Sequence, residues 1–326
     1  MTISARVICD SIYDGGPRLT TFVLRYPRFI HSELMTHRVF SRNAASSRAI
    51  PIQKMIQAVK DDPAMPVWWG KNQPGMSARE ELSDDDWDII SIPGPVTPSS
   101  RQRARDEWLR ARDSAVAHVE ALMKTGLHKQ IANRILEPWA HIEVVLTGTE
   151  WTNFYALRNH PDAQPEFQEL AQKMLVAHNA SQPKYLLKGQ WHLPFVTAED
   201  YVQYFPNLKP GESPAPGDWL LLKISAARCA RVSYLKHDGG TSTLEEDRAL
   251  FDRLMSGDVK HASPTEHQAK VPPDGRVWPE HISNLNGWIQ FRKLIQGENI
   301  VSYPVLVSNE EICRRNHPGH GGHGSR

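Results

Sequence analysis

The densest group of side chains that could bind a ligand lies between Thr36 and Arg48. These thirteen residues combine a His-Arg pair at 37–38, a carboxamide at Asn43, several hydroxyl groups and two further arginines, without a single Gly or Pro. Hydrogen-bond donors at this density usually bind a polyanion or a polar heterocycle. The alternative, a solvated basic loop, is typically richer in Lys, Glu and Gly. We therefore predict a ligand site in this stretch.

The composition is that of a soluble globular protein, with 40% hydrophobic and 23% charged residues among 326. A net charge of +1 gives no electrostatic reason to expect polymeric nucleic acid as a partner. No apolar run has the length of a signal peptide or a membrane span, so we expect a cytoplasmic protein without membrane association. Three widely spaced cysteines predict no disulfide framework and fit a reducing compartment.

A hairpin and a short helix precede the Thr36–Arg48 stretch and must position it. The pattern of β-branched and aromatic residues predicts strands at 3–9 and 19–26, joined by a Gly-containing turn at 14–17. A helix at 29–35 would then deliver the His-Arg pair.

Apolar residues recur at helical spacing in much of the remaining chain. The helices predicted on this basis span residues 53–60, 100–123, 128–135, about 138–157, 165–178 and 243–255. The fourth would carry Pro138 in its first turn, and the last begins with a capping box at 243–246. Pro-rich connections lie at 61–100 and 180–218. A further strand is expected at 300–307, and the tail at 316–326 is expected to be disordered.

Three blocks of the sequence resemble motifs of one enzyme family. Residues 21–48 resemble the signature of the flavin-dependent thymidylate synthases (ThyX), R-H-R-x-x-S-x-N-E-x-S-x-R, together with the strand and short apolar helix that precede it. Residues 133–138 resemble the family's A-R-x-x-L-P, and residues 153–166 resemble its N-F-x-x-L-R followed by A-Q-x-E. The resemblance implies an α/β protein of the α+β type, with helices packed on a mostly antiparallel sheet.

A fourth block occurs out of order. Residues 226–234 and 261–267 resemble A-A-R-V-S-Y and H-x-T-P-x-E-H, which precede the signature in the family. Because they follow the other blocks here, we predict a circularly permuted chain in which residues 225–270 match the family's N-terminal part. Residues 1–326 would then form a single catalytic domain, with the two Pro-rich connections as insertions.

Transfer of a one-carbon unit to C5 of a pyrimidine normally needs a nucleophile at C6, often a cysteine. None of Cys9, Cys229 and Cys313 lies in a convincing nucleophile setting. The resemblance implies another route, in which reduced FAD carries the methylene group of 5,10-methylenetetrahydrofolate and the hydride, with NADPH as reductant. It also implies a deoxypyrimidine monophosphate as substrate, and a homotetramer whose active sites are shared between subunits.

The resemblance also assigns roles to individual residues. The nucleotide would contact Glu33, Ser46, Arg48, Arg134 and Arg158, and the flavin would contact His37, Arg38, Val39, Asn43, Asn153, His261 and Ser263. Arg158 would be the catalytic residue, because it matches the residue thought to favour the N3-ionised uracil and so to raise the electron density at C5. Two alternatives stay open: Arg134 and Arg158 as helix salt bridges, and Ser233 or Glu266 as caps of turns. We expect no metal site.

Several departures from the family's pattern concern the substrate more than the fold. Thr36 replaces the first Arg of R-H-R, Ala44 replaces a Glu, Glu33 a Gln and Asp162 a His, while Thr-Gly-Thr at 147–149 replaces N-A-R. The favoured reaction is the reductive methylation of dUMP to dTMP. A carboxylate at position 33 would instead suit the amino group of cytosine. The alternatives are therefore methylation or hydroxymethylation of dCMP, hydroxymethylation of dUMP, and a non-catalytic nucleotide-binding protein.

Overall fold

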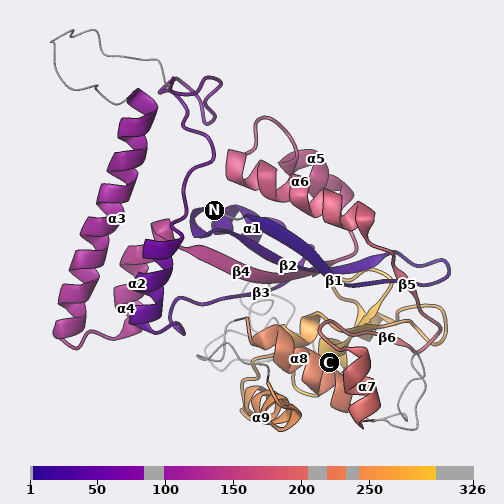
Figure 1. Cartoon of the computed structure of the whole chain (residues 1–326). Coiled ribbons are helices and arrows are strands. Elements are labelled where there is room, and N and C mark those ends of the chain that lie inside the picture. The colour runs from indigo at the N-terminus through magenta and orange to yellow at the C-terminus, as the bar shows by residue number, and fades with distance from the viewer. Residues whose placement is uncertain (1–2, 84–98, 205–218, 233–241, 299–326) are drawn as a thin grey trace, which may run out of the picture.

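The computed structural model describes residues 3–83, 99–204, 219–232 and 242–298 of the chain. These residues form an α+β fold in which helices pack around a five-stranded, mostly antiparallel sheet (Figure 1). Across these ranges, no helix is both long and apolar enough to span a membrane.

The central sheet has the strand order β3-β4-β2-β1-β5. Its strands are β1 (Ser4–Ile12), β2 (Leu19–Pro27), β3 (Ser41–Ala44), β4 (His141–Gly148) and β5 (Lys184–Tyr185). All neighbours are antiparallel except β1 and β5. Because β3 is an edge strand, the sheet presents part of the Thr36–Arg48 stretch at its border.

The helices form three groups around this sheet. They are α1 (His31–Met35), α2 (Ile52–Asp61), α3 (Ser100–Lys124), α4 (Lys129–Ala132), α5 (Thr152–Arg158), α6 (Pro165–Ala180), α7 (Ala198–Tyr204), α8 (Leu220–Ala230) and α9 (Leu244–Met255). Figure 1 shows α5 and α6 over one face of the sheet and α7, α8 and α9 on the opposite side. The helices α2, α3 and α4 stand together beside the sheet.

Each group of helices has its own buried apolar cluster. The largest lies between the central sheet and α6, where Phe22, Val144 and Phe167 are fully buried. A second joins α2 and α3 through Val59 and Val119. The loss of this apolar surface from water is the main force that holds the helices to the sheet.

Most of the predicted elements are confirmed. The hairpin of β1 and β2, the helices α2, α3 and α6, and the capping box at the start of α9 lie close to their predicted positions. In the hairpin turn, Gly15 has a φ of 72°, a left-handed conformation that favours glycine. The helix predicted at 29–35 is divided into a 3-10 turn, Arg28–Ile30, and α1.

The long helix predicted at about 138–157 is wrong. Residues His141–Gly148 form β4, and only Thr152–Arg158 form a helix. Helices cover both sides of the central sheet (Figure 1), so the last five residues of β4 are all buried, and no alternation of polar and apolar residues marks them as a strand. The β-branched pair Val144-Val145 was the available signal.

The helix predicted at 128–135 is also shorter than expected. Only α4 is α-helical, and the chain continues as a 3-10 helix, Asn133–Trp139, which contains Pro138. Proline lacks the N–H group that an α-helix needs, and its ring clashes with the preceding turn. The whole 133–138 block therefore lies in a 3-10 helix that ends shortly before β4 begins.

The described part of the first Pro-rich connection packs on α3. Trp69 meets Trp108 edge to face, with 6.4 Å between the ring centroids. Trp108 also donates a hydrogen bond to the carbonyl of Ala64 at 2.9 Å. These contacts attach residues 61–83 to the helix that follows the connection.

The second Pro-rich connection, 180–218, contributes β5, α7 and a strand of a smaller sheet. Its residues 205–218 lie outside the described ranges. The strand predicted at 300–307 and the tail at 316–326 also lie outside them.

The smaller sheet has the order β6-β7-β8, from β6 (Trp191–His192), β7 (Ala269–Lys270) and β8 (Ile289–Gln290). A buried chain of side chains joins it to the central sheet. His192 Nε2 lies 2.8 Å from the hydroxyl of Thr21, the hydroxyls of Thr21 and Thr147 are 2.7 Å apart, and Thr147 lies 2.8 Å from His267 Nδ1. Burial lowers the pKa of both imidazoles to about 3, so both are neutral at pH 7.

Candidate functional site

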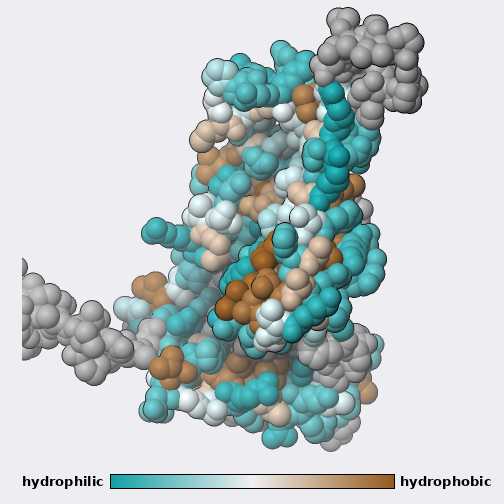
Figure 2. Space-filling model, turned by 90° about the vertical axis from the view of Figure 1, so that its left-hand side faces the viewer, coloured by the Kyte–Doolittle hydropathy of each residue, from teal (hydrophilic) through white to brown (hydrophobic). Residues whose placement is uncertain are grey.

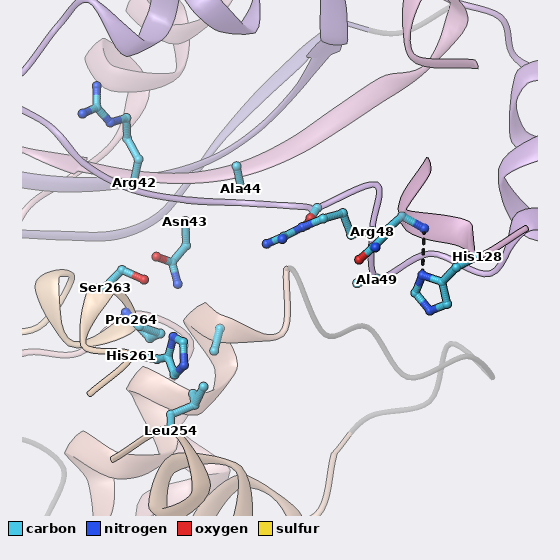
Figure 3. Close-up of a pocket in the computed structure, with 13 residues that line it drawn as sticks. Arg42, Asn43, Ala44, Arg48, Ala49, His128, Leu254, His261, Ser263 and Pro264 are labelled. Atoms are coloured by element: carbon cyan, nitrogen blue, oxygen red, sulfur yellow. Dashed lines mark hydrogen bonds between the residues drawn. The ribbon is translucent and has the colours of Figure 1, made fainter. Parts of the chain in front are cut away.

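A cavity of about 470 Å³ opens between β3 with the loop that follows it, the start of α4, and the segment 261–264 (Figure 3). Its lining includes the cationic or hydrogen-bonding residues Arg48, His128, His261 and Ser263. None of the described residues that line it is acidic. A cavity with several donors and no carboxylate favours an anionic ligand.

Segments far apart in the sequence meet at one end of this cavity. Asn43 on β3 faces the segment that contains Ser263 and His261 (Figure 3). The Asn43 carboxamide is buried and donates to the carbonyl of Cys229 in α8 at 3.4 Å. The out-of-order block therefore lies directly beside the signature stretch.

The loop after β3 carries Ser46 and Arg48, and both residues line the cavity. A backbone hydrogen bond from Ala49 N–H to the Ser46 carbonyl, at 3.0 Å, closes a tight turn that contains both residues. Arg48 is exposed and makes no hydrogen bond or ion pair with any described residue. An uncommitted guanidinium beside a hydroxyl is a suitable donor pair for a phosphate.

Arg134 does not line the cavity but stands behind the same loop. Its Nη1 lies 2.9 Å from Glu137 Oε1, and its side chain is 53% exposed. The same carboxylate oxygen accepts a hydrogen bond from Ser47 at 2.6 Å and lies 3.1 Å from Arg28 Nε. Arg134 is therefore tied to the loop through Glu137, with the rest of its guanidinium turned to solvent.

A second cluster surrounds Arg158 at the end of α5. Arg158 Nε donates to His37 Nε2 at 2.8 Å, and Arg158 Nη2 donates to the hydroxyl of Thr36 at 3.2 Å. Arg158 Nη1 lies 3.7 Å from Glu33 Oε2, and the guanidinium stacks 4.7 Å from the ring centroid of Phe167. Contacts on four sides hold this cation in one orientation.

The charges of this cluster are interdependent. Burial, together with the charges of Arg158 and Arg42, lowers the pKa of His37, so the imidazole is neutral and accepts the hydrogen bond through Nε2. Burial raises the pKa of Glu33, an effect that the charge of Arg158 opposes. The cluster therefore places one oriented cation beside a partly buried carboxyl group.

Of the predicted site residues, Arg134 stands behind the loop that follows β3, and the others fall into three places. Asn43, Ser46, Arg48, His261 and Ser263 line the cavity. Glu33, His37 and Arg158 form the second cluster and do not line it. The remaining predicted flavin contacts, Arg38, Val39 and Asn153, are exposed on the surface and also lie outside the cavity lining.

Some of the residues for which the sequence left a purely structural role open do form structural contacts. Arg134 and Arg158 both form ion pairs, with Glu137 and Glu33 respectively. Glu266 forms a close ion pair with Arg292. Ser233 lies outside the described residues. Both arginines remain partly exposed, so an ion pair with a neighbour does not prevent either from binding a ligand.

Sequence reasoning missed four residues near the cavity: His128, Gln130, Asn133 and Glu137. His128 and Gln130 line it, and His128 Nδ1 accepts a hydrogen bond from the backbone of Gln130 at 3.2 Å. Asn133 and Glu137 stand where the motif A-R-x-x-L-P has Ala and Leu. These two substitutions of polar for apolar residues were the signal that could have identified them.

A comparison with protein families gives one match. The family model described as thymidylate synthase complementing protein matches residues 19–184, just over half of the chain. The matched range contains β2, the Thr36–Arg48 stretch, Arg134 and Arg158, and it ends before the segment 225–270. A comparison with curated proteins gives no match.

Proposed function

The chain belongs to the thymidylate synthase complementing protein family, the flavin-dependent thymidylate synthases, and on this premise we propose that it methylates C5 of dUMP to give dTMP. The co-substrates would be 5,10-methylenetetrahydrofolate and NADPH, with FAD as cofactor. One observation carries the proposal: the acid-free cavity brings Ser46 and Arg48 together with Asn43, His261 and Ser263.

The donors of the cavity fit a nucleotide phosphate beside a flavin. Ser46 and Arg48 would bind the phosphate, because a hydroxyl and a guanidinium on one tight turn can both donate to its oxygens. Asn43, His261 and Ser263 would bind polar atoms of the flavin. A volume of about 470 Å³ is typical of a small-molecule site. Bound FAD would supply the chemistry that side chains lack, the transfer of the one-carbon unit and of the hydride.

The chain's own residues would orient and polarise the substrate. Arg158, held by His37, Thr36 and Phe167, would place a fixed positive charge at the pyrimidine and favour its N3-ionised form. A fixed cation needs no reorganisation as negative charge develops on the ring. The neutral state of His37 keeps its Nε2 available as the acceptor that orients Arg158.

A site shared between subunits accounts for the separation of the predicted residues. We propose that the Arg158 cluster of one subunit completes the cavity of another in a homotetramer. The support is that Arg38 and Asn153 are exposed, next to the exposed apolar side chains of Met35, Val39 and Leu157. Figure 2 shows the side of the molecule where α3 lies in Figure 1, which is largely hydrophilic with several apolar patches.

The test is a product analysis with the full chain. The protein is incubated with FAD, NADPH, 5,10-methylenetetrahydrofolate and either dUMP or dCMP, and the nucleotide is examined by mass spectrometry. We expect dUMP to gain a methyl group. A hydroxymethyl product would assign a different reaction to the same site. Tight nucleotide binding without any product would replace the proposal by that of a non-catalytic nucleotide-binding protein.

A second candidate substrate is dCMP, and Glu33 favours it. Cytosine presents an amino donor at C4 where uracil presents a carbonyl acceptor. An ionised Glu33, 3.7 Å from Arg158, would accept from the amino group but repel the uracil carbonyl. If dCMP is the substrate, Glu33→Gln lowers kcat/KM for dCMP and raises it for dUMP. If Glu33→Gln leaves the ratio of the two kcat/KM values unchanged, Glu33 does not select the base.

A further inference from the structure

Behind the loop 45–50, three donors from separate segments converge on one carboxylate oxygen. Glu137 Oε1 accepts from Ser47 Oγ at 2.6 Å and from Arg134 Nη1 at 2.9 Å, and Arg28 Nε lies 3.1 Å away. The Glu137 side chain is 23% exposed and that of Arg28 15%, so these two partners are largely shielded from water, whereas the Arg134 side chain is 53% exposed. Charge-assisted hydrogen bonds in such surroundings are stronger than those between neutral groups.

A buried carboxamide holds the same loop from the same 3-10 helix. Asn133 is fully buried, and its Nδ2 donates to the carbonyls of Ser47 at 2.8 Å and Ile50 at 2.9 Å. Arg28 adds a hydrogen bond to the carbonyl of Ala45 at 3.1 Å. The backbone of the loop is therefore anchored at both ends of the turn that carries Ser46 and Arg48.

Glu137 connects the two predicted phosphate-binding elements by accepting hydrogen bonds from a side chain of each. Ser47 stands between Ser46 and Arg48, and Arg134 lies on the 3-10 helix, so one oxygen atom links the loop to the second arginine. The motif A-R-x-x-L-P has leucine at this position, and leucine could make neither bond. Glu137 is therefore a feature of this chain rather than of the motif.

We propose that Glu137 is a positioning residue of a phosphate subsite made by Ser46, Arg48 and Arg134. It holds the loop and Arg134 in a fixed relation, so that both guanidinium groups can bind a single phosphate monoester. This inference rests on the proposed function, because it takes the phosphate to be that of the nucleotide substrate. Since the partners of Glu137 are Ser47, Arg134 and Arg28 and not residues of the Arg158 cluster, it acts on binding and not on the chemical step.

The test compares nucleotide with nucleoside binding by calorimetry, using dUMP and deoxyuridine as probes. We expect Glu137→Gln to weaken dUMP binding about tenfold, the equivalent of one charge-assisted hydrogen bond, and to leave deoxyuridine binding unchanged. With turnover as the readout, KM for dUMP rises while kcat is retained. Equal losses for dUMP and deoxyuridine, or no loss for dUMP, would overturn the proposal.

Two further variants keep the test decisive. Ser47→Ala removes one of the three donors without leaving a buried charge unpaired, and it should weaken dUMP binding in the same selective way. Glu120→Gln is the matched control, since Glu120 pairs with Lys60 at 3.1 Å on the exposed faces of α3 and α2, away from the loop. If the wild-type protein binds dUMP without turning it over, the proposed function fails while the role of Glu137 is still measured. If Glu137→Gln and Ser47→Ala both bind dUMP as tightly as the Glu120→Gln control, the role of Glu137 is refuted even in an active enzyme.

Discussion

Arg158→Ala is the variant that most directly separates catalysis from folding. The proposal gives Arg158 the task of stabilising negative charge on the pyrimidine in the transition state. Removal of one preorganised donor of this kind typically costs a factor of about 10² to 10³ in kcat, or about 3–4 kcal/mol. We therefore expect turnover with dUMP to fall by about that factor.

The expected loss of stability is much smaller. The ion pair with Glu33 is partly exposed, with side chains 21% and 35% accessible, and contributes about 0–1 kcal/mol. The stacking on Phe167 and the hydrogen bond to His37 contribute about 1 kcal/mol each at most. A total of roughly 2 kcal/mol lowers the Tm of a chain of this size by only about 3 °C. The variant should therefore fold.

The assay pairs steady-state turnover with thermal unfolding of the same preparations. Arg276→Ala is a suitable control, because the Arg276 guanidinium lies 3.8 Å from the ring centroid of Trp278 but outside both clusters. The control should lose a comparable stacking contact and keep full turnover. The turnover of Arg158→Lys should lie between that of the wild type and that of Arg158→Ala, since Lys keeps the positive charge but not the planar guanidinium group. Unchanged turnover in a folded Arg158→Ala variant would refute the assigned role.

Three further predictions concern pH, the cysteines and a glycine. His192 and His267 have pKa values of about 3 in the folded protein because of burial, well below an unfolded value of about 6.5. Their contribution to stability is complete above pH 6.5 and is lost as the pH falls, by about 2 kcal/mol each at pH 5; equal free energies of unfolding in urea at pH 7.5 and pH 5 would contradict this. Burial raises the pKa of Cys9 to about 12 and also raises that of Cys229, so Cys9→Ala and Cys229→Ala should keep turnover. Loss of turnover in either folded variant would point to a cysteine nucleophile after all. Gly148→Ala would place a Cβ 2.5 Å from Phe40 Cδ1 and should lower the free energy of unfolding by about 1–3 kcal/mol; an unchanged Tm would show that the Phe40 ring yields.

The fold was predictable where one face of an element meets water. In the hairpin of β1 and β2 and in the amphipathic helices α2, α3 and α6, apolar and polar residues recur with the period of the element because one face is exposed to water. The strand β4 lacks this pattern, because helices lie on both sides of the central sheet and residues 144–148 are all buried. A continuous apolar run has no period, so its length and its β-branched residues were the remaining guides.

The sequence motifs identified five of the residues that line the cavity, but they did not give the arrangement of the candidate site. Motif matching brought Asn43 and Ser263 together across more than two hundred residues, and the structure places them at one cavity. Motifs could not predict that Arg158 lies outside the lining of that cavity, because a motif records the order of residues along the chain and not their positions in space. Nor could they reveal Glu137, whose role depends on three contacts made by one oxygen atom.

The circular permutation remains a prediction, and the contacts of the segment 225–270 explain how the fold accommodates it. This segment bonds to the signature strand through Asn43 and Cys229, and to β4 through Thr147 and His267. Both are contacts between side chains or backbone groups that lie far apart along the chain, so they depend on position in space and not on the order of segments. A family member with the segment at its start would make them equally well, provided that the new ends lie at the surface. The order of blocks can therefore change while the cavity, its donors and its lack of acidic residues are retained.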